Sequence, residues 1–241
     1  MPDRPLQGID LVVFDKDGTL LDFGAMWGGW AHELGARLEL TTGRPVAPDV
    51  WAAIGYDPAS RVIASRGPLA VGTMGQHADL VQQVVRRWCP NVAAARRAVD
   101  AAWFEPDPVE RAIPLTDLPA LFSVLRSTGR SIAVVTNDDR EPTARTLAAL
   151  GVLGQLSALV CADDGLAVKP EADTFLAACE RAGVEPACAA MVGDLPVDLL
   201  MARAAGAGRA IGVASGLASP DELEPLSDLV LGSVAELPSL L

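Results

Sequence analysis

The chain of 241 residues contains little histidine, cysteine or tyrosine, with two, four and one of these residues respectively. Its cysteines form no C-x-x-C pair and have no neighbouring histidine, so neither a zinc site nor a disulfide framework is supported. Reduced thiols within the core are expected instead. The cysteines are Cys89, Cys161, Cys179 and Cys188.

Positive charge is also scarce, since 19 lysines and arginines stand against 31 aspartates and glutamates, for a formal net charge of -12. Because no run of basic residues occurs, the chain is not expected to bind nucleic acid. It lacks any stretch of about 18 consecutive apolar residues. Residues 1–8 lack the basic and apolar parts of a secretion signal. These absences predict a soluble cytoplasmic protein with no membrane partner, and we expect a monomer or a homodimer.

What the sequence does contain is a regular alternation of aliphatic runs and helical patterns. The runs are near-continuous rather than alternating in polarity, which is typical of parallel strands buried on both faces. They cover residues 9–14, 131–136, 158–161, 189–192, 210–213 and 228–231. Crossover helices are expected at 115–127, 142–150, 171–182 and 197–205. The pattern predicts an α/β fold with a doubly wound, Rossmann-like parallel sheet.

One connection is far longer than a normal crossover, because roughly 90 residues separate the first strand from the next strand and helix. We therefore expect residues 1–22 and 112–241 to form the α/β core domain, and residues 23–111 a smaller inserted α-helical cap. All five tryptophans, the tyrosine and both histidines lie in this insert, and most of the aromatics are expected to form its core. Apolar residues that recur there at helical spacing include Trp27, Trp30, Leu34, Leu38, Leu80, Val81, Val84, Val85, Trp88, Val92, Val99 and Trp103.

The first strand leads directly into a pair of carboxylates. The run IDLVVF at residues 9–14 is followed by Asp15 and Asp17, in a segment that also contains Gly18. Two carboxylates one residue apart can hold a hard cation through oxygen ligands, which favours a catalytic pair. The alternative is an ordinary strand end, where Asp, Gly and Thr form turns and cap helices.

Polar groups also follow two later strands. Thr136 and Asn137 end the second strand, where ligands of open α/β sheets bind, although a helix cap or turn is an equal alternative on this stretch alone. Asp194 and Asp198 follow the fourth strand, again with a turn and a helix cap as the alternative. Lys169 precedes a proline at the expected start of a helix, though lysines are more often solvated. The coincidence of four such segments favours a single site.

In content and order these segments resemble the haloacid dehalogenase superfamily, and within it the phosphatases that carry a helical cap after the first motif, such as phosphoglycolate phosphatase. The sequence DKDGTL at residues 15–20 matches the first motif of that superfamily, and Thr136 the second. Lys169 matches the third motif, and GDLPVD at residues 193–198 the fourth. The resemblance covers nearly the whole chain, with no departure at a catalytic position.

The resemblance implies a magnesium-dependent phosphatase that hydrolyses a small phosphorylated metabolite. Asp15 is then the nucleophile that becomes an aspartyl phosphate. Asp17 is then the general acid and base, and its backbone carbonyl binds Mg²⁺. Asp194 would complete the magnesium site with Asp15, while Asp198 would orient water or Lys169 from behind the metal. The phosphoryl oxygens would be bound by Thr136, Asn137 and Lys169.

Two other functions stay open at this point. A phosphomutase of the same superfamily also keeps an acid at the position of Asp17, whereas the dehalogenases act on carbon and need no acid for a departing halide. A noncatalytic binding or regulatory module should have lost a carboxylate or the lysine, and all of these residues are present. Hydrolysis of phosphate esters is therefore the favoured reaction.

Overall fold

The structure, a computed structural model, describes residues 5–241 and divides into two compact units. One unit takes the chain up to Asp22 and again from Ala112 to Leu241, and the other spans Phe23–Arg111. That the second unit acts as a cap stays a prediction. Among residues 5–241, no helix is both long enough and apolar enough to cross a membrane.

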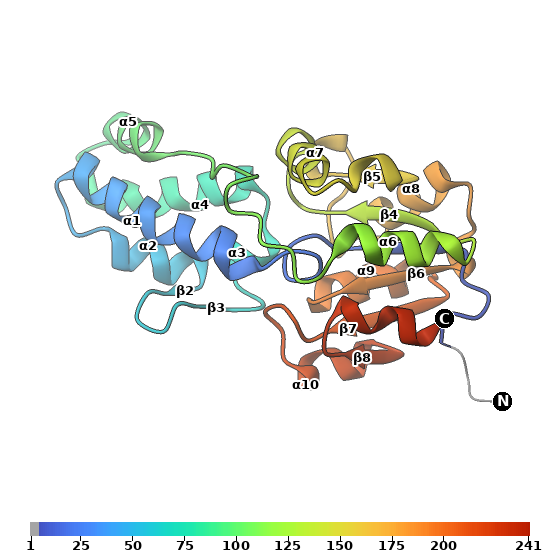
Figure 1. Ribbon diagram of the computed structural model, residues 1–241. Coiled ribbons are helices and arrows are strands. Elements are labelled where there is room, and N and C mark those ends of the chain that lie inside the picture. The colour runs from blue at the N-terminus through green and yellow to red at the C-terminus, as the bar shows by residue number, and fades with distance from the viewer. Residues whose placement is uncertain (1–4) are drawn as a thin grey trace. The chain divides into compact units, whose positions relative to one another are not determined.

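The first unit is built on a six-stranded parallel sheet in the order β5-β4-β1-β6-β7-β8 (Figure 1). Its strands are β1 (Leu11–Phe14), β4 (Ser131–Val135), β5 (Ala158–Val160), β6 (Ala189–Gly193), β7 (Arg209–Val213) and β8 (Leu229–Leu231). Strands β1 and β6 are buried along their whole length, as their near-continuous apolar runs predict. The expected parallel α/β fold is confirmed, with small differences at the strand ends.

Helices pack on both faces of this sheet. On one face, Phe14 stacks on Phe122 with ring centroids 5.6 Å apart, within a buried cluster that includes Val12, Ile132 and Val192. Because the strand register pairs Val12 with Ile132 and Phe14 with Val192, alternate residues of neighbouring strands share that face. The core helices are α6 (Leu118–Ser127), α7 (Arg140–Ala149), α8 (Asp173–Ala182), α9 (Pro196–Ala204) and α10 (Pro220–Leu223).

All four expected crossover helices begin at residues other than those expected, and α6 and α7 illustrate the reasons. Helix α6 begins at Leu118 rather than Leu115, because the Asp117 side chain accepts the Ala120 N–H at 3.0 Å and caps the helix there. Helix α7 begins at Arg140, ahead of the expected start at Pro142. A proline fits within the first turn, because the N–H that it lacks has no partner in the helix. A local cap therefore sets the start of α6.

The second unit is mainly helical but not wholly so. Its helices are α1 (Gly29–Thr42), α2 (Ala47–Ile54), α3 (Pro68–Val71), α4 (Met74–Val85) and α5 (Val92–Ala102). It also contains a short antiparallel pair, β2 (Tyr56–Asp57) and β3 (Val62–Ile63), which an all-helical insert did not predict. Val92 recurs at helical spacing but does not belong to the core. It is 51% exposed, and the buried face of α5 begins only at Ala95.

Aromatic rings fill the interior of this second unit. Trp30 is fully buried, and its ring meets those of Trp27 and Trp103 edge-on, with centroids 5.8 and 5.4 Å apart. Its indole N–H donates to the Phe104 carbonyl at 2.9 Å. His77 is buried beside the rings of Trp27 and Trp30. The expectation that aromatics form the core of the insert is confirmed for Trp27 and Trp30, while Trp103 is partly exposed.

Candidate functional site

The turn after β1 presents Asp15 and Asp17, each 8% exposed. The turn is closed by the Gly18 N–H, which donates to the Leu21 carbonyl at 2.6 Å. Gly18 has a φ of +92°, and a Cβ at this position would lie 2.3 Å from a carboxylate oxygen of Asp194. Both the backbone conformation and the close approach of that carboxylate therefore require glycine.

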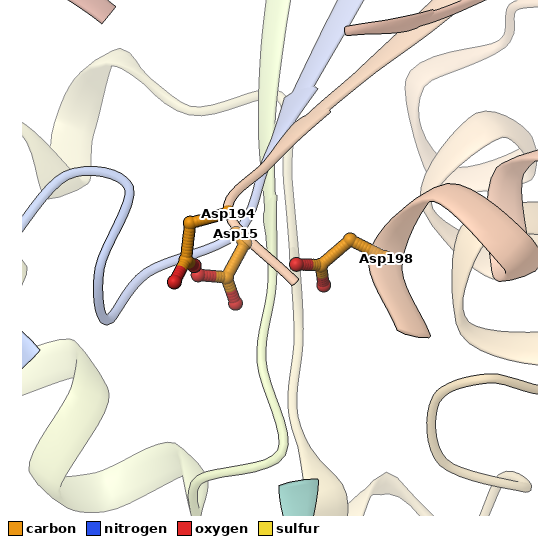
Figure 2. A group of neighbouring side chains, drawn as sticks. All are labelled: Asp15, Asp194 and Asp198. Atoms are coloured by element: carbon orange, nitrogen blue, oxygen red, sulfur yellow. The ribbon is translucent and has the colours of Figure 1, made fainter. Parts of the chain in front are cut away.

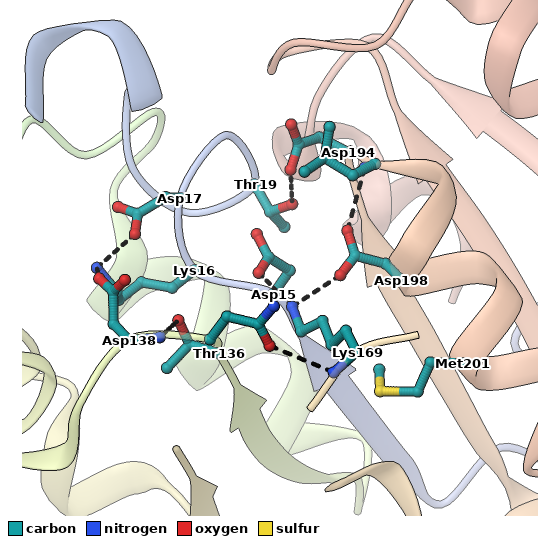
Figure 3. A network of polar contacts seen from close by, with 12 residues as sticks. Asp15, Lys16, Asp17, Thr19, Thr136, Asp138, Lys169, Asp194, Asp198 and Met201 are labelled. Atoms are coloured by element: carbon teal, nitrogen blue, oxygen red, sulfur yellow. Dashed lines mark hydrogen bonds and ion pairs between the residues drawn. The ribbon is translucent and has the colours of Figure 1, made fainter. Parts of the chain in front are cut away.

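Lys169 joins two of the carboxylates. Its ammonium donates to Oδ1 of Asp15 at 2.5 Å and to Oδ1 of Asp198 at 2.7 Å (Figure 3). Burial alone would lower the pKa of Lys169, but the charges of Asp15 and Asp198 outweigh it and raise the pKa, so the lysine stays protonated. Burial also raises the pKa of Asp198 to about 6, although Lys169 opposes the rise. The second oxygen of Asp198 accepts the Leu195 N–H at 3.1 Å.

Lys169 lies in a loop and not at the start of a helix, so that part of the expectation was wrong. Helix α8 begins only at Asp173. The segment forms a turn instead, in which the Glu171 N–H donates to the Val168 carbonyl at 3.0 Å. The Lys169 N–H donates to the side-chain oxygen of Asn137 at 3.3 Å. This bond fastens the lysine-bearing loop to the end of β4.

Asp194 is fully buried and is held by two segments that are far apart in the sequence. The Thr19 hydroxyl donates to its Oδ1 at 3.2 Å, and the Leu217 N–H donates to its Oδ2 at 3.0 Å. Burial, followed by the charges of Asp15 and Asp198, raises the pKa of Asp194 well above its ordinary value. The orientation of this carboxyl is thus fixed, while its ionisation is opposed by its neighbours.

Sequence reasoning missed the loop after β7, which forms part of the site. Its Leu217 N–H binds Asp194, and the Ser215 hydroxyl donates to the Gly18 carbonyl at 2.9 Å. A Cβ on Gly216 would lie 1.9 Å from Asp194 Oδ2, so only glycine fits there. These contacts use backbone groups and small residues. The only signal in the sequence was the small-residue segment that follows a buried strand.

Sequence reasoning also missed Lys16. The chain contains two lysines, Lys16 and Lys169, and both are buried in this site. The Lys16 ammonium lies 2.6 Å from Oδ2 of Asp17 and 2.9 Å from Oδ2 of Asp138. Burial raises the pKa of Asp17 to about 7, although the charge of Lys16 opposes the rise. Asp17 is therefore a buried carboxyl group that can carry a proton near neutral pH.

Thr136 and Asn137 lie at the carboxyl end of β4, as expected. Thr136 is buried, and its hydroxyl oxygen accepts the Asp138 N–H at 3.2 Å. The side chain of Asn137 meets the Lys169 loop. The structure thus places the expected site residues at the ends of β1, β4 and β6, in the first turn of α9 and in the loop before α8 (Figure 3). Their roles toward a phosphoryl group stay predictions.

The carboxylates fit a hard divalent cation. Asp15, Asp194 and Asp198 each offer an oxygen that lies within 4.8 Å of the others (Figure 2). Oδ2 of Asp15 is buried and accepts no hydrogen bond among residues 5–241. Carboxylates outnumber ammonium groups in this buried region, and a bound cation would balance the surplus of negative charge. Asp198 belongs to this group, although it was expected to orient water or Lys169 and not to bind the metal. Binding of the metal by the Asp17 carbonyl stays a prediction.

Comparison with known proteins agrees with this arrangement. Residues 9–206 match the haloacid dehalogenase-like hydrolase family. The chain is 28% identical over 255 residues to the plasmid-encoded phosphoglycolate phosphatase of Cupriavidus necator, covering 95% of this chain and 92% of that one. It is 28% identical over 196 residues to validoxylamine A 7'-phosphate phosphatase of Streptomyces hygroscopicus subsp. limoneus, covering 81% of this chain and 82% of the relative.

The fold is also similar to that of solved structures. A crystal structure described as a predicted phosphoglycolate phosphatase from Haemophilus somnus has a TM-score of 0.67, with 97% of this chain and 98% of that chain covered. The sequence identity in this pair is 17%, so the likeness shows the fold alone.

Proposed function

The chain belongs to the haloacid dehalogenase-like hydrolase family, and from this premise we propose that it is a phosphatase that hydrolyses a small organic phosphate monoester through a phosphorylated Asp15. Phosphoglycolate is the first substrate to test, because relatives that align with most of the chain are named for that activity. The buried carboxylate cluster is a second observation that supports chemistry on phosphate esters.

The observation that carries the proposal is the unequal state of the two oxygens of Asp15. Lys169 holds Oδ1, while Oδ2 is buried and accepts no hydrogen bond among residues 5–241. A carboxylate fixed through one oxygen presents the other as a nucleophile. In the first step Oδ2 forms a bond to phosphorus, and the bond from phosphorus to the ester oxygen breaks. In the second step water attacks phosphorus, and Asp15 is released together with inorganic phosphate.

Asp17 is suited to transfer the proton in both steps. In the first step the leaving alcohol needs a proton on its oxygen, and in the second the attacking water must lose one. A group whose pKa is near 7 can do both, and burial raises the pKa of Asp17 to about 7. Asp17 would therefore give its proton to the departing oxygen and recover a proton from water.

Lys169, Thr136 and Asn137 would bind the oxygens of the phosphoryl group. Lys169 keeps its charge beside Asp15 and can offset negative charge that develops during transfer. We propose Mg²⁺ as the cofactor, held by Asp15, Asp194 and the Asp17 carbonyl, where its charge would neutralise the phosphoryl oxygens. Asp198 would keep Lys169 in position through their 2.7 Å contact.

The proposal is tested with the purified protein and a panel of phosphate monoesters that includes phosphoglycolate and p-nitrophenyl phosphate. We expect release of inorganic phosphate with Mg²⁺, and a loss of at least ~100-fold in rate with excess chelator that added Mg²⁺ restores. Full activity in chelator would reject the metal assignment. Formation of an isomeric phosphate ester without release of phosphate would identify a phosphomutase instead.

A further inference from the structure

Lys16 is a buried lysine that the reaction described above does not use. It is 2% exposed and lies between Asp17 and Asp138, at 2.6 and 2.9 Å. Buried ammonium groups are costly unless they are paired, and this one is paired on both sides. It connects the turn after β1 with the end of β4, while the second lysine, Lys169, binds a different pair of carboxylates (Figure 3).

Of the two ion pairs that the Lys16 side chain makes within residues 5–241, the one with Asp17 leads to the reacting atoms. Its ion pairs are with Oδ2 of Asp17 and Oδ2 of Asp138, whereas Asp15 is paired with Lys169. Asp138 is itself anchored, because its N–H donates to the Thr136 hydroxyl and its carbonyl accepts the Ala162 N–H at 3.0 Å. Lys16 therefore ties Asp17 to a fixed point in the loop after β4.

The pairing distinguishes the two oxygens of Asp17. Oδ2 accepts from Lys16, while Oδ1 is buried and has no hydrogen-bond partner among residues 5–241. Asp15 shows the same pattern, with one oxygen held by Lys169 and the other open. Each carboxyl of the pair is thus held through one oxygen by one lysine. A protonated carboxyl held in this way accepts from the lysine on Oδ2 and carries its proton on Oδ1.

We propose that Lys16 is a positioning residue that holds Oδ2 of Asp17, so that Oδ1 is the oxygen that gives its proton to the leaving group and later takes one from water. The inference rests on the proposed phosphatase function. A displacement of about 1 Å of a reacting group can cost about 100-fold in rate, so loss of this contact should be visible in catalysis.

The test compares two substrates of similar size, p-nitrophenyl phosphate and phenyl phosphate. Phenolate is the poorer leaving group and depends more on a proton donor. We expect Lys16→Met to lower kcat for phenyl phosphate about 10-fold more than kcat for p-nitrophenyl phosphate. Asp17→Asn should lower the ratio of kcat for phenyl phosphate to kcat for p-nitrophenyl phosphate at least as far. The double variant Lys16→Met/Asp17→Asn should match Asp17→Asn within about twofold, because Lys16 acts through that carboxyl.

Equal losses on both substrates would overturn the proposal, because a merely structural role lowers both rates together. A further drop in the ratio in the Asp17→Asn background would also overturn it, since Lys16 would then act independently of Asp17. If Lys16→Met does not fold, Lys16→Met/Asp138→Asn also removes the partly exposed charge that was paired with Lys16, and the same ratio is expected from it.

A measurement without turnover checks the contact directly. Because the chain has two lysines, protein labelled with ¹⁵N-lysine should give two side-chain ammonium signals, which Lys16→Met assigns. Asp17→Asn should shift the Lys16 signal and leave the Lys169 signal in place, and the reverse result would overturn the contact. If the wild-type protein hydrolyses no ester of the panel, phosphoglycolate included, the phosphatase function fails, whereas hydrolysis of the two aryl esters with an unchanged substrate ratio in Lys16→Met rejects only the role of Lys16.

Discussion

The insert at residues 23–111 buries aromatic rings, whereas the core buries charged groups. Within the insert, all of which the structure describes, His77 is the only polar side chain besides Tyr56 that is buried. The core buries four aspartates and both lysines, and these are the residues of the candidate site. Burial of rings stabilises a fold, while burial of charges costs stability and is kept where chemistry uses it. The difference places the reactive groups in the core, which is stabilised by a buried apolar cluster of its own that includes Phe14 and Phe122.

The largest expected effect tests the role of the charged groups that the core buries. Asp15→Asn removes the nucleophile but keeps the shape of the side chain, so we expect kcat to fall by at least about 10,000-fold. Asp228→Asn is the matched control, because Asp228 is a half-exposed carboxylate paired with Arg203 at 3.0 Å. It should change kcat by less than about twofold. Activity above 1% of wild type in Asp15→Asn would break the assignment.

The next effect tests the role of the aromatic rings that the insert buries. Trp30→Ala leaves a cavity at a fully buried ring, so we expect the free energy of unfolding to fall by about 3–5 kcal/mol. Urea unfolding followed by tryptophan fluorescence measures it, since all five tryptophans lie in the insert. Trp88→Ala is the control, because the indole N–H of Trp88 makes an exposed bond to Asp49 at 3.0 Å. Equal losses in the two variants would contradict the role given to the buried rings.

A pair of glycines separates backbone strain from disturbance of the site. Gly18 and Gly8 have φ of +92° and +77°, but a Cβ meets Asp194 at Gly18 and nothing within 4 Å at Gly8. Both alanine variants should lose about 1 kcal/mol of stability through the backbone. Only Gly18→Ala should also lower kcat/KM, by about 10- to 100-fold, as measured on p-nitrophenyl phosphate. A comparable loss of activity in Gly8→Ala would show that strain alone explains it.

The smallest effect concerns a charged group of the core that lies outside the site, formed by Asp164 with Arg140 and Arg181. Burial tends to raise the pKa of Asp164, but hydrogen bonds from Arg140 and Arg181 outweigh it, so the pKa of Asp164 lies below its ordinary value. The stabilisation is therefore complete above pH 4 to 5, near the unfolded pKa of about 3.9, and is lost as the pH falls further. Asp164→Asn should cost about 0.5–1 kcal/mol at pH 7, because both arginines are partly exposed.

Circular dichroism during urea unfolding at pH 7 and pH 3 measures this difference between Asp164→Asn and the wild-type protein. The difference should shrink at pH 3, where the wild-type carboxylate begins to take up a proton. A difference that grows on acidification would contradict the sign of the pKa shift.

Much of the core could be predicted because its strands are buried on both faces and therefore appear in the sequence as unbroken apolar runs. Asp15, Thr136 and Asp194 follow such runs directly, so the parallel order of the strands places them at one edge. Lys169 could be assigned to the site by its motif, but its place in a loop depends on the bond to Asn137 from another strand.

The parts that could not be predicted depend on contacts between distant segments. Lys16 looks like a solvated side chain until Asp138, which follows a different strand, is placed beside it. The loop after β7 contributes through the Leu217 N–H and through the absence of a side chain at Gly216, and neither has a signature of residue type. The short β2 and β3 pair has two residues in each strand, too few for a recognisable pattern.

The hydrogen bond from the Leu217 N–H to Asp194 has a consequence for synthesis of the protein on the ribosome. Some of the contacts that build the site join residues 154 to 197 positions apart, as in Lys169 with Asp15 and Ser215 with Gly18. A nascent chain exposes Asp15 and Asp17 early, but it cannot orient Asp194 until the loop after β7 has left the ribosome. The chain therefore acquires a complete site only late in its synthesis. An unfinished chain contains the reactive carboxylates but cannot use them in catalysis.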